Sequence, residues 1–246
     1  MKHMLLLGGL AFFVAPLTGF GQSSATDSTL LVASVKSASS HYTAAISNNS
    51  ELFNGPEYVF YNKALQKTKG HPFFETDQPQ KGSVLYNGAS FSDVPLLYDI
   101  KLDQLITFYP VSLLKIQLIT PSVGSFSVNN HSFIYLSEDK EANFTAGFYE
   151  LLVSGEASVI ARRVKETEKS IQGGQIEYSF IERDKYYIRY NEKPSLVSSA
   201  ADITRLFPDQ KKELQKFVKS NRLRFKKNSR EKDMIQLVSY YNALSK

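Results

Sequence analysis

The sequence predicts an α+β fold, with a largely antiparallel meander sheet of about 9–11 strands between an N-terminal helix and a C-terminal helical segment. Apolar and polar residues alternate along residues 51–198, and turn residues separate the runs. No helical pattern interrupts these runs, so consecutive strands must pair antiparallel. Residues 199–246 instead repeat apolar residues every three or four positions, as helices do. We expect a half-barrel or a sandwich, because the apolar face of the sheet needs a second layer.

The composition is that of a folded domain. The chain has 246 residues, of which 42% are hydrophobic and 22% are charged. These values exclude a disordered chain and a polytopic membrane protein. The chain contains 17 Phe and 14 Tyr, residues that favour strands, and no Trp. It also contains no Cys, so disulfide bonds, thiolate metal sites and cysteine nucleophiles are excluded.

The N-terminus has the three parts of a secretory signal peptide. Lys2 supplies a basic start, residues 4–20 are mostly apolar, and Gly19 and Gly21 are the third and first residues before a cleavage point ahead of Gln22. A membrane anchor is the alternative, but it needs about 18 uninterrupted apolar residues, and glycine and proline interrupt this run. We therefore expect an exported bacterial protein, periplasmic or extracellular, that loses residues 1–21 and keeps no transmembrane span.

The mature chain, residues 22–246, is expected to form one domain with three parts. Residues 22–50 contain a predicted helix, because apolar residues recur at helical spacing over residues 31–45. Residues 51–198 form the β region. Residues 199–246 form a basic helical segment.

Turn residues divide the β region into hairpins. Asn87-Gly88 and Asn129-Asn130 are favoured two-residue hairpin turns, because both positions tolerate a positive φ. Pro95 lacks a backbone N–H, which predicts a strand edge or a bulge there. The expected strands are residues 58–61, 84–86, 91–98, 105–109, 113–119, 126–128, 133–136, 148–153, 157–164, 176–180 and 186–190.

Three helices are expected at the C-terminus. Ser199 followed by Asp202 is a capping-box pattern that begins the first helix. Pro208 suits the first turn of the second helix, and Asn228-Ser229 caps the third. Each helix has an apolar stripe at core spacing, so we expect the helices to pack on the sheet rather than lie on a membrane.

The C-terminal segment is also strongly basic. From Ala201 to Lys246 there are twelve Lys or Arg and five Asp or Glu. Export excludes nucleic acid as the partner of such a cluster, which leaves phospholipid, lipopolysaccharide, wall polymer or an acidic protein. The alternative is a solvated helical face that keeps the protein soluble. The candidate residues for an anionic partner are Lys211, Lys212, Lys216, Lys219, Arg222, Arg224, Lys226 and Lys227.

Residues that would carry catalysis are scarce. The sequence has no nucleophile elbow, zinc-protease motif, phosphate-binding loop or dinucleotide fingerprint. Asp99 with Asp103 resembles a glycosidase pair in spacing, as does Glu75 with Asp77, but turn residues that bond the local backbone explain both pairs. We predict no catalytic residue, no cofactor and no metal site.

Four stretches of the chain carry a resemblance: Leu52–Tyr58, Gly70–Phe74, Gly82–Asp103 and Leu206–Leu214. Together they resemble a group of uncharacterised exported proteins of Gram-negative bacteria. The resemblance covers nearly the whole mature chain. It implies export and a single β-rich domain, and it implies no activity.

Three functions remain open from sequence. The first is a non-enzymatic cell-envelope protein that binds another protein or an anionic lipid or polymer. The second is a periplasmic carrier that holds a hydrophobic ligand or lipid in a cavity of the curved sheet. The third is a hydrolase. We predict the first.

Overall fold

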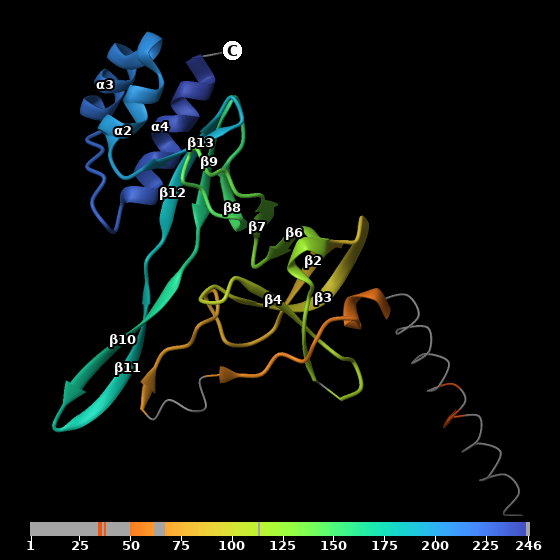
Figure 1. The fold of residues 1–246 in the computed structure, drawn as a ribbon. Coiled ribbons are helices and arrows are strands. Elements are labelled where there is room, and N and C mark those ends of the chain that lie inside the picture. Colours follow the sequence, from red (N-terminus) through yellow and green to blue (C-terminus); the bar gives the residue numbers. More distant parts are fainter. Residues whose placement is uncertain (1–33, 36, 38–49, 62–66, 113, 245–246) are drawn as a thin grey trace, which may run out of the picture. The chain divides into compact units, whose positions relative to one another are not determined.

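The computed structural model describes residues 34–35, 37, 50–61, 67–112 and 114–244. The chain divides into two compact units, residues 1–48 and residues 49–246, and the fold described below is that of the second (Figure 1). The predicted signal peptide lies outside the described residues, as does nearly all of the predicted N-terminal helix. No helix of the described part is long and apolar enough to cross a membrane.

An open ten-stranded antiparallel sheet is the centre of the unit, which confirms the α+β class and the antiparallel pairing. Its strands lie in the order β13-β12-β9-β8-β7-β6-β2-β3-β4-β5. Most neighbours are hairpin partners, and β2–β6 and β9–β12 are the longer-range pairs. The strands are β2 (Gln80–Tyr86), β3 (Ala89–Asp99), β4 (Gln104–Phe108), β5 (Lys115–Gln117), β6 (Val123–Val128), β7 (His131–Leu136), β8 (Gly147–Val153), β9 (Ala157–Arg162), β12 (Lys185–Tyr190) and β13 (Lys193–Val197).

The predicted hairpin turns are confirmed by their backbone angles. Asn87 and Gly88 have φ of 50° and 80°, and Asn129 and Asn130 have φ of 49° and 64°. Pro95 lies near a bulge: the pairing of β3 with β2 shifts between Gly82 and Val84. The proline was expected at such a place, because it cannot donate a ladder hydrogen bond.

A second, three-stranded sheet has the order β1-β11-β10. β10 (Lys165–Gln172) and β11 (Gln175–Glu182) form a hairpin, and the two-residue β1 (Thr68–Lys69) pairs parallel with β11. The sequence did not predict β10 or β13, and the strand expected over residues 157–164 ends at Arg162.

The prediction of a strand at residues 58–61 is wrong. Residues 58–61 form no strand, and the neighbouring Glu57 makes an isolated bridge to Ile116. The aromatic residues there are instead a packing layer: Tyr58 is 4% exposed, and its hydroxyl donates to Asp99 Oδ2 at 2.7 Å.

The C-terminal segment forms α2 (Ala200–Leu206), α3 (Lys211–Ser220) and α4 (Arg230–Leu244), as predicted. A short 3₁₀ turn, η4 (Pro208–Gln210), precedes α3, and two others are η1 (Ser50–Phe53) and η3 (Thr120–Ser122). α4 packs against β8 and β9 (Figure 1). The helices thus cover part of the sheet, and they share a buried cluster with it that includes Val159, Ile188, Leu214, Leu237 and Val238.

The rest of the sheet has a second core, made largely of aromatic rings. Phe126 and Phe133 stack at 4.7 Å between ring centroids, and Tyr98 meets each of them edge-on at 5.1 Å. Phe133, Tyr98 and Phe148 are at most 2% exposed. Side chains therefore fill the apolar face of β2, β3 and β6–β8.

Candidate functional site

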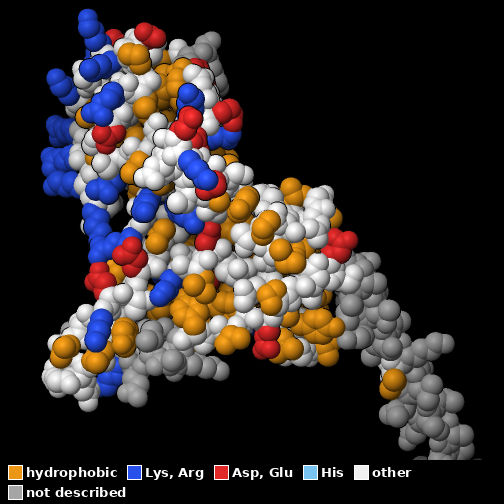
Figure 2. All heavy atoms as spheres, viewed as in Figure 1, with side chains coloured by type: hydrophobic (Ala, Val, Ile, Leu, Met, Phe, Trp, Pro, Cys, Tyr) orange, Lys and Arg blue, Asp and Glu red, His pale blue; other side chains and the backbone are white. Residues whose placement is uncertain are grey.

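All eight predicted basic residues are exposed in the structure. Four of them, Lys211, Lys212, Lys216 and Lys219, lie on α3, and the other four lie on residues 221–229, between α3 and α4. Figure 2 shows Lys and Arg side chains gathered over the C-terminal helices. We call these eight residues the basic surface.

Three of the lysines form a single stripe on α3. Residues of a helix turn by about 100° each, so Lys212, Lys216 and Lys219 lie within a sector of about 60°. This sector is opposite Leu214, which is fully buried against the core. Like charges spaced four residues apart repel and cost about 0.2–0.5 kcal/mol per pair. The stripe therefore concentrates three positive charges on one side of α3, and their repulsion slightly lowers the stability of the helix.

The basic surface has no carboxylate partner within the described part of the chain. Among the described residues, none of its eight side chains lies within 4.0 Å of an Asp or Glu oxygen, although eleven Lys or Arg ion pairs occur elsewhere, some of them equally exposed. A charge without an internal partner keeps its full attraction for an external anion.

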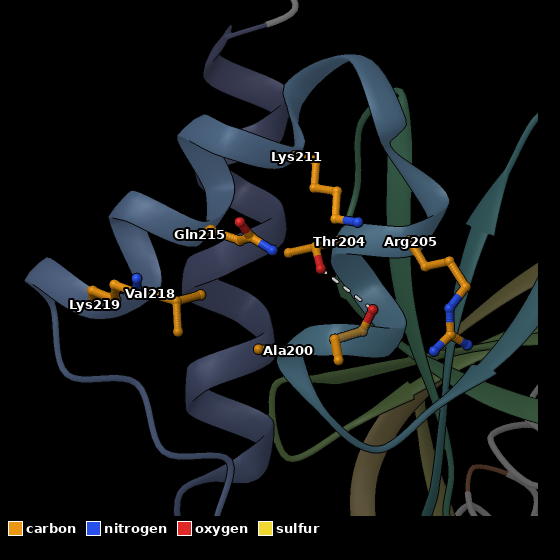
Figure 3. Close-up of a pocket in the computed structure, with 8 residues that line it drawn as sticks. Ala200, Thr204, Arg205, Lys211, Gln215, Val218 and Lys219 are labelled. Carbon is orange, nitrogen blue, oxygen red and sulfur yellow. Dashed lines mark hydrogen bonds between the residues drawn. The ribbon is translucent and has the colours of Figure 1, made fainter.

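A pocket of about 460 Å³ opens between α2 and α3. Lys211, Gln215 and Lys219 line it from α3, and Thr204 and Arg205 line it from α2. Figure 3 shows the side chains of Lys211 and Gln215 pointing towards Thr204. The sequence had singled out the two lysines but not Gln215, Thr204 or Arg205, because only the approach of α2 to α3 makes them neighbours.

Aromatic stacking holds the helices that carry the basic surface. Phe217 of α3 stacks on Tyr240 of α4 with 4.1 Å between the ring centroids. Phe207 stacks on Tyr241 of α4 with 3.7 Å between the centroids. The segment that follows α3 is held by Asp233, whose Oδ2 accepts from the backbone N–H of Arg224 and Phe225. These contacts fix the backbone that carries the basic residues.

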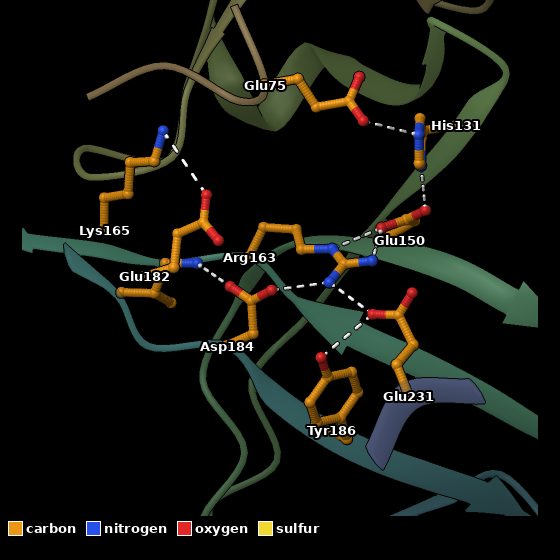
Figure 4. Close-up of polar contacts among 10 residues, drawn as sticks. Glu75, His131, Glu150, Arg163, Lys165, Glu182, Asp184, Tyr186 and Glu231 are labelled. Atoms are coloured by element: carbon orange, nitrogen blue, oxygen red, sulfur yellow. Dashed lines mark hydrogen bonds and ion pairs between the residues drawn. The ribbon is translucent and has the colours of Figure 1, made fainter. Parts of the chain in front are cut away.

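A buried charge network lies on the neighbouring part of the sheet, and sequence reasoning missed it (Figure 4). Arg163 is at its centre, and its side chain is 9% exposed. Its guanidinium donates to Glu150 at 2.5 Å, to Asp184 at 2.6 Å and to Glu231 of α4 at 2.7 Å. His131 extends the network, with Nδ1 2.5 Å from Glu150 and Nε2 3.2 Å from Glu75.

The network shifts the pKa values of its members. Burial favours loss of the Arg163 proton, but the bonds to Glu231, Glu150 and Asp184 outweigh it and raise the pKa of Arg163. Burial alone would raise the pKa of Glu231, but the hydrogen bond and charge of Arg163 hold it below its usual range. The guanidinium of Arg163 is hydrogen-bonded to all three carboxylates, so its role is structural: it holds β8, α4 and the residue before β12 together.

A depression of about 280 Å³ adjoins the network, and four of its eight lining residues are carboxylates: Glu75, Glu182, Asp184 and Glu231. Negative charge predominates there, so it repels anions. The basic surface is therefore the better place for an anionic partner.

Asp99 and Asp103, one of the two acidic pairs considered for catalysis, have structural partners. Asp99 is fully buried, and its Oδ1 accepts from the backbone N–H of Lys101 and Leu102, as expected of a turn residue. Asp103 accepts from the hydroxyl of Tyr98 at 2.6 Å and from Arg162 at 3.0 Å. Among the described residues no group of three or more His, Asp or Glu side chains could hold a metal ion.

Comparisons of the chain with protein-family models, with curated proteins and with solved structures found no match.

Proposed function

We propose that the protein is an exported, non-enzymatic cell-envelope protein that binds an anionic surface partner through the basic surface. The observation that carries this proposal is the stripe of Lys212, Lys216 and Lys219, exposed on a helix whose opposite side is fixed in the core. The N-terminal signal pattern supports the location. The family resemblance agrees with it.

The physics of such a surface predicts weak, salt-sensitive attachment. A basic side chain that reaches an anionic membrane contributes about 1 kcal/mol. Attraction between exposed charges falls off over about 8 Å at physiological ionic strength. A stripe of three lysines thus gives an interaction that holds only where anions are dense, as on a membrane or a polymer.

The proposal is tested by sedimentation of the mature protein, residues 22–246, with vesicles. We expect binding to phosphatidylglycerol vesicles and none to neutral phosphatidylcholine vesicles. Lys212→Gln with Lys216→Gln should weaken binding about 30-fold, because two contributions of about 1 kcal/mol are lost. Purification from the envelope fraction of the native cell, with Gln22 as the first residue, tests the location.

The matched control replaces two exposed lysines outside the basic surface, Lys140→Gln with Lys193→Gln. It removes the same net charge and should change binding little. Equal binding of the two double variants would show that net charge, not the stripe, attracts the vesicles, and equal binding to neutral vesicles would refute the proposal.

The carrier alternative has one observation in its favour. An apolar depression of about 290 Å³ lies between η1, the first half of β3 and the end of β4, with Leu52, Val94 and Phe108 in its lining. It is a surface depression of modest size for a lipid, while the apolar face of the sheet is filled by aromatic rings. We therefore prefer the anionic partner. A mass increment of lipid size under non-denaturing conditions would favour the carrier instead.

A further inference from the structure

The pocket between α2 and α3 has a cation at each end of its α3 side. Lys211 begins α3, and Lys219 lies eight residues later, which places their Cα atoms about 12 Å apart along the helix axis. Both line the pocket, and neither has an ion-pair partner among the described residues. Their separation is greater than one phosphate group spans.

Neutral groups occupy the space between these two lysines. The Gln215 amide points into the pocket, towards Thr204 (Figure 3), and within the described part of the chain it makes no side-chain hydrogen bond. Ala200 and Val218 add small apolar surface to the lining. An amide and apolar patches between two cations suit an uncharged spacer, such as a sugar, between two anionic groups.

Asp202, a carboxylate on α2 beside the pocket, is already engaged. Asp202 of α2 accepts from the backbone N–H of Ser198 and Ser199, and these bonds lower its pKa. On the α2 side, Arg205 Nη1 lies 3.9 Å from Asp202 Oδ1, so the carboxylate partly neutralises the charge of Arg205. No carboxylate is in the lining of the pocket itself. The free positive charge is therefore that of Lys211 and Lys219.

We propose that this pocket binds a ligand with two phosphate groups on a sugar-sized spacer, one phosphate at Lys211 and the other at Lys219. The volume of about 460 Å³ exceeds what a single phosphate needs and suits a small phosphorylated sugar. The proposal deepens the proposed function, because it names the anionic chemistry that part of the basic surface recognises. The two phosphates belong either to a soluble sugar or to a group displayed on a membrane surface.

Calorimetric titration of the mature protein at low salt tests the pocket with two soluble probes. Fructose 1,6-bisphosphate should bind about tenfold more tightly than fructose 6-phosphate, because the second phosphate adds one charge-assisted contact. Lys211→Gln should reduce the affinity for the bisphosphate to that for the monophosphate. Lys219→Gln should do the same from the other end.

The control is Lys193→Gln, which removes one exposed lysine outside the basic surface and should change the affinity for the bisphosphate less than threefold. Thermal unfolding verifies that each variant is folded, as expected for exposed side chains. Equal affinity for the two sugars, or unchanged binding by Lys211→Gln, overturns the proposal.

A second experiment determines whether the phosphates in the pocket come from a soluble sugar or from a membrane surface. Excess fructose 1,6-bisphosphate is added to protein already bound to phosphatidylglycerol vesicles. Displacement means that surface phosphates occupy the pocket, and retention with tight sugar binding means that the pocket takes a soluble ligand. If the protein binds the bisphosphate but no vesicle, the proposed surface function fails and the pocket stands. If it binds vesicles through the stripe but shows no preference for the bisphosphate, the pocket fails alone.

Discussion

At the scale of single residues, Arg163 shows where sequence reasoning stops. In the sequence it is one of two arginines at the end of a predicted strand, and its carboxylate partners stand at positions 150, 184 and 231. No spacing rule links those positions, because the contacts arise from strand pairing and from α4. The exposure of the basic residues was predictable, because charged side chains are exposed in most proteins. A buried ion pair was not predictable, because its partners meet only in the folded structure.

Loss of Arg163 should destabilise the protein strongly. Arg163→Gln leaves Glu150, which is 3% exposed, as a buried carboxylate without its main counter-charge. We expect the free energy of unfolding to fall by about 3–5 kcal/mol, as for broken buried pairs, measured by urea denaturation. Arg183→Gln is the matched control, because Arg183 pairs with Glu168 at the surface, and it should cost less than about 1 kcal/mol. Equal losses for the two variants would mean that burial of the network contributes nothing.

At the scale of elements, local signals predicted best where the chain must adopt a special backbone conformation. The Asn-Gly and Asn-Asn turns and the capping box of α2 all satisfy backbone requirements set within four residues. β10 gave no such signal: only Ile171 of its eight residues is apolar, so the alternation of a half-buried strand is missing. The pocket between α2 and α3 was likewise not predictable, because each helix carries only half of it.

The capping box of α2 yields a test of its own. Ser199 Oγ accepts from the backbone N–H of Asp202 and donates to Asp202 Oδ2. α2 has seven residues and is too short to be stable without such caps. Ser199→Ala should lower the free energy of unfolding by about 1 kcal/mol, measured by urea denaturation. Ser220→Ala, at the exposed end of α3, is the control and should change it by less than about 0.5 kcal/mol; a similar loss in both variants would deny the cap its role.

At the scale of the whole molecule, the order of strands depends on pairs that lie far apart in sequence. β2 lies between β3 and β6, and β12 reaches β9 across the β10–β11 hairpin. Each of these choices is decided by the summed burial of a sheet face and not by a local motif. Sequence could therefore predict hairpins and an antiparallel sheet, while the second sheet and the position of the helices over β8 and β9 needed the structure.

The response of the whole fold to acid follows from carboxyl groups that the fold holds ionised. The pKa values of Glu231 and Asp202 are lower in the folded protein than usual. Such groups stabilise the fold above their unfolded pKa, about pH 4, and the stabilisation is lost as the pH falls through the folded pKa. We expect the free energy of unfolding, measured in urea at several pH values, to decrease from about pH 5 downwards.

Arg163→Gln tests the origin of this acid response, because the variant removes the charge that lowers the pKa of Glu231. The difference in unfolding free energy between the wild type and the variant should be largest near neutral pH. It should shrink as the pH falls below the unfolded pKa, about pH 4, and reach its minimum below the lowered folded pKa of Glu231 in the wild type, where Glu231 is protonated in both proteins. Arg183→Gln, which leaves the network intact, should follow the wild-type curve. A difference that stays constant with pH would assign the cost of losing Arg163 to its hydrogen bonds and packing, and not to its charge.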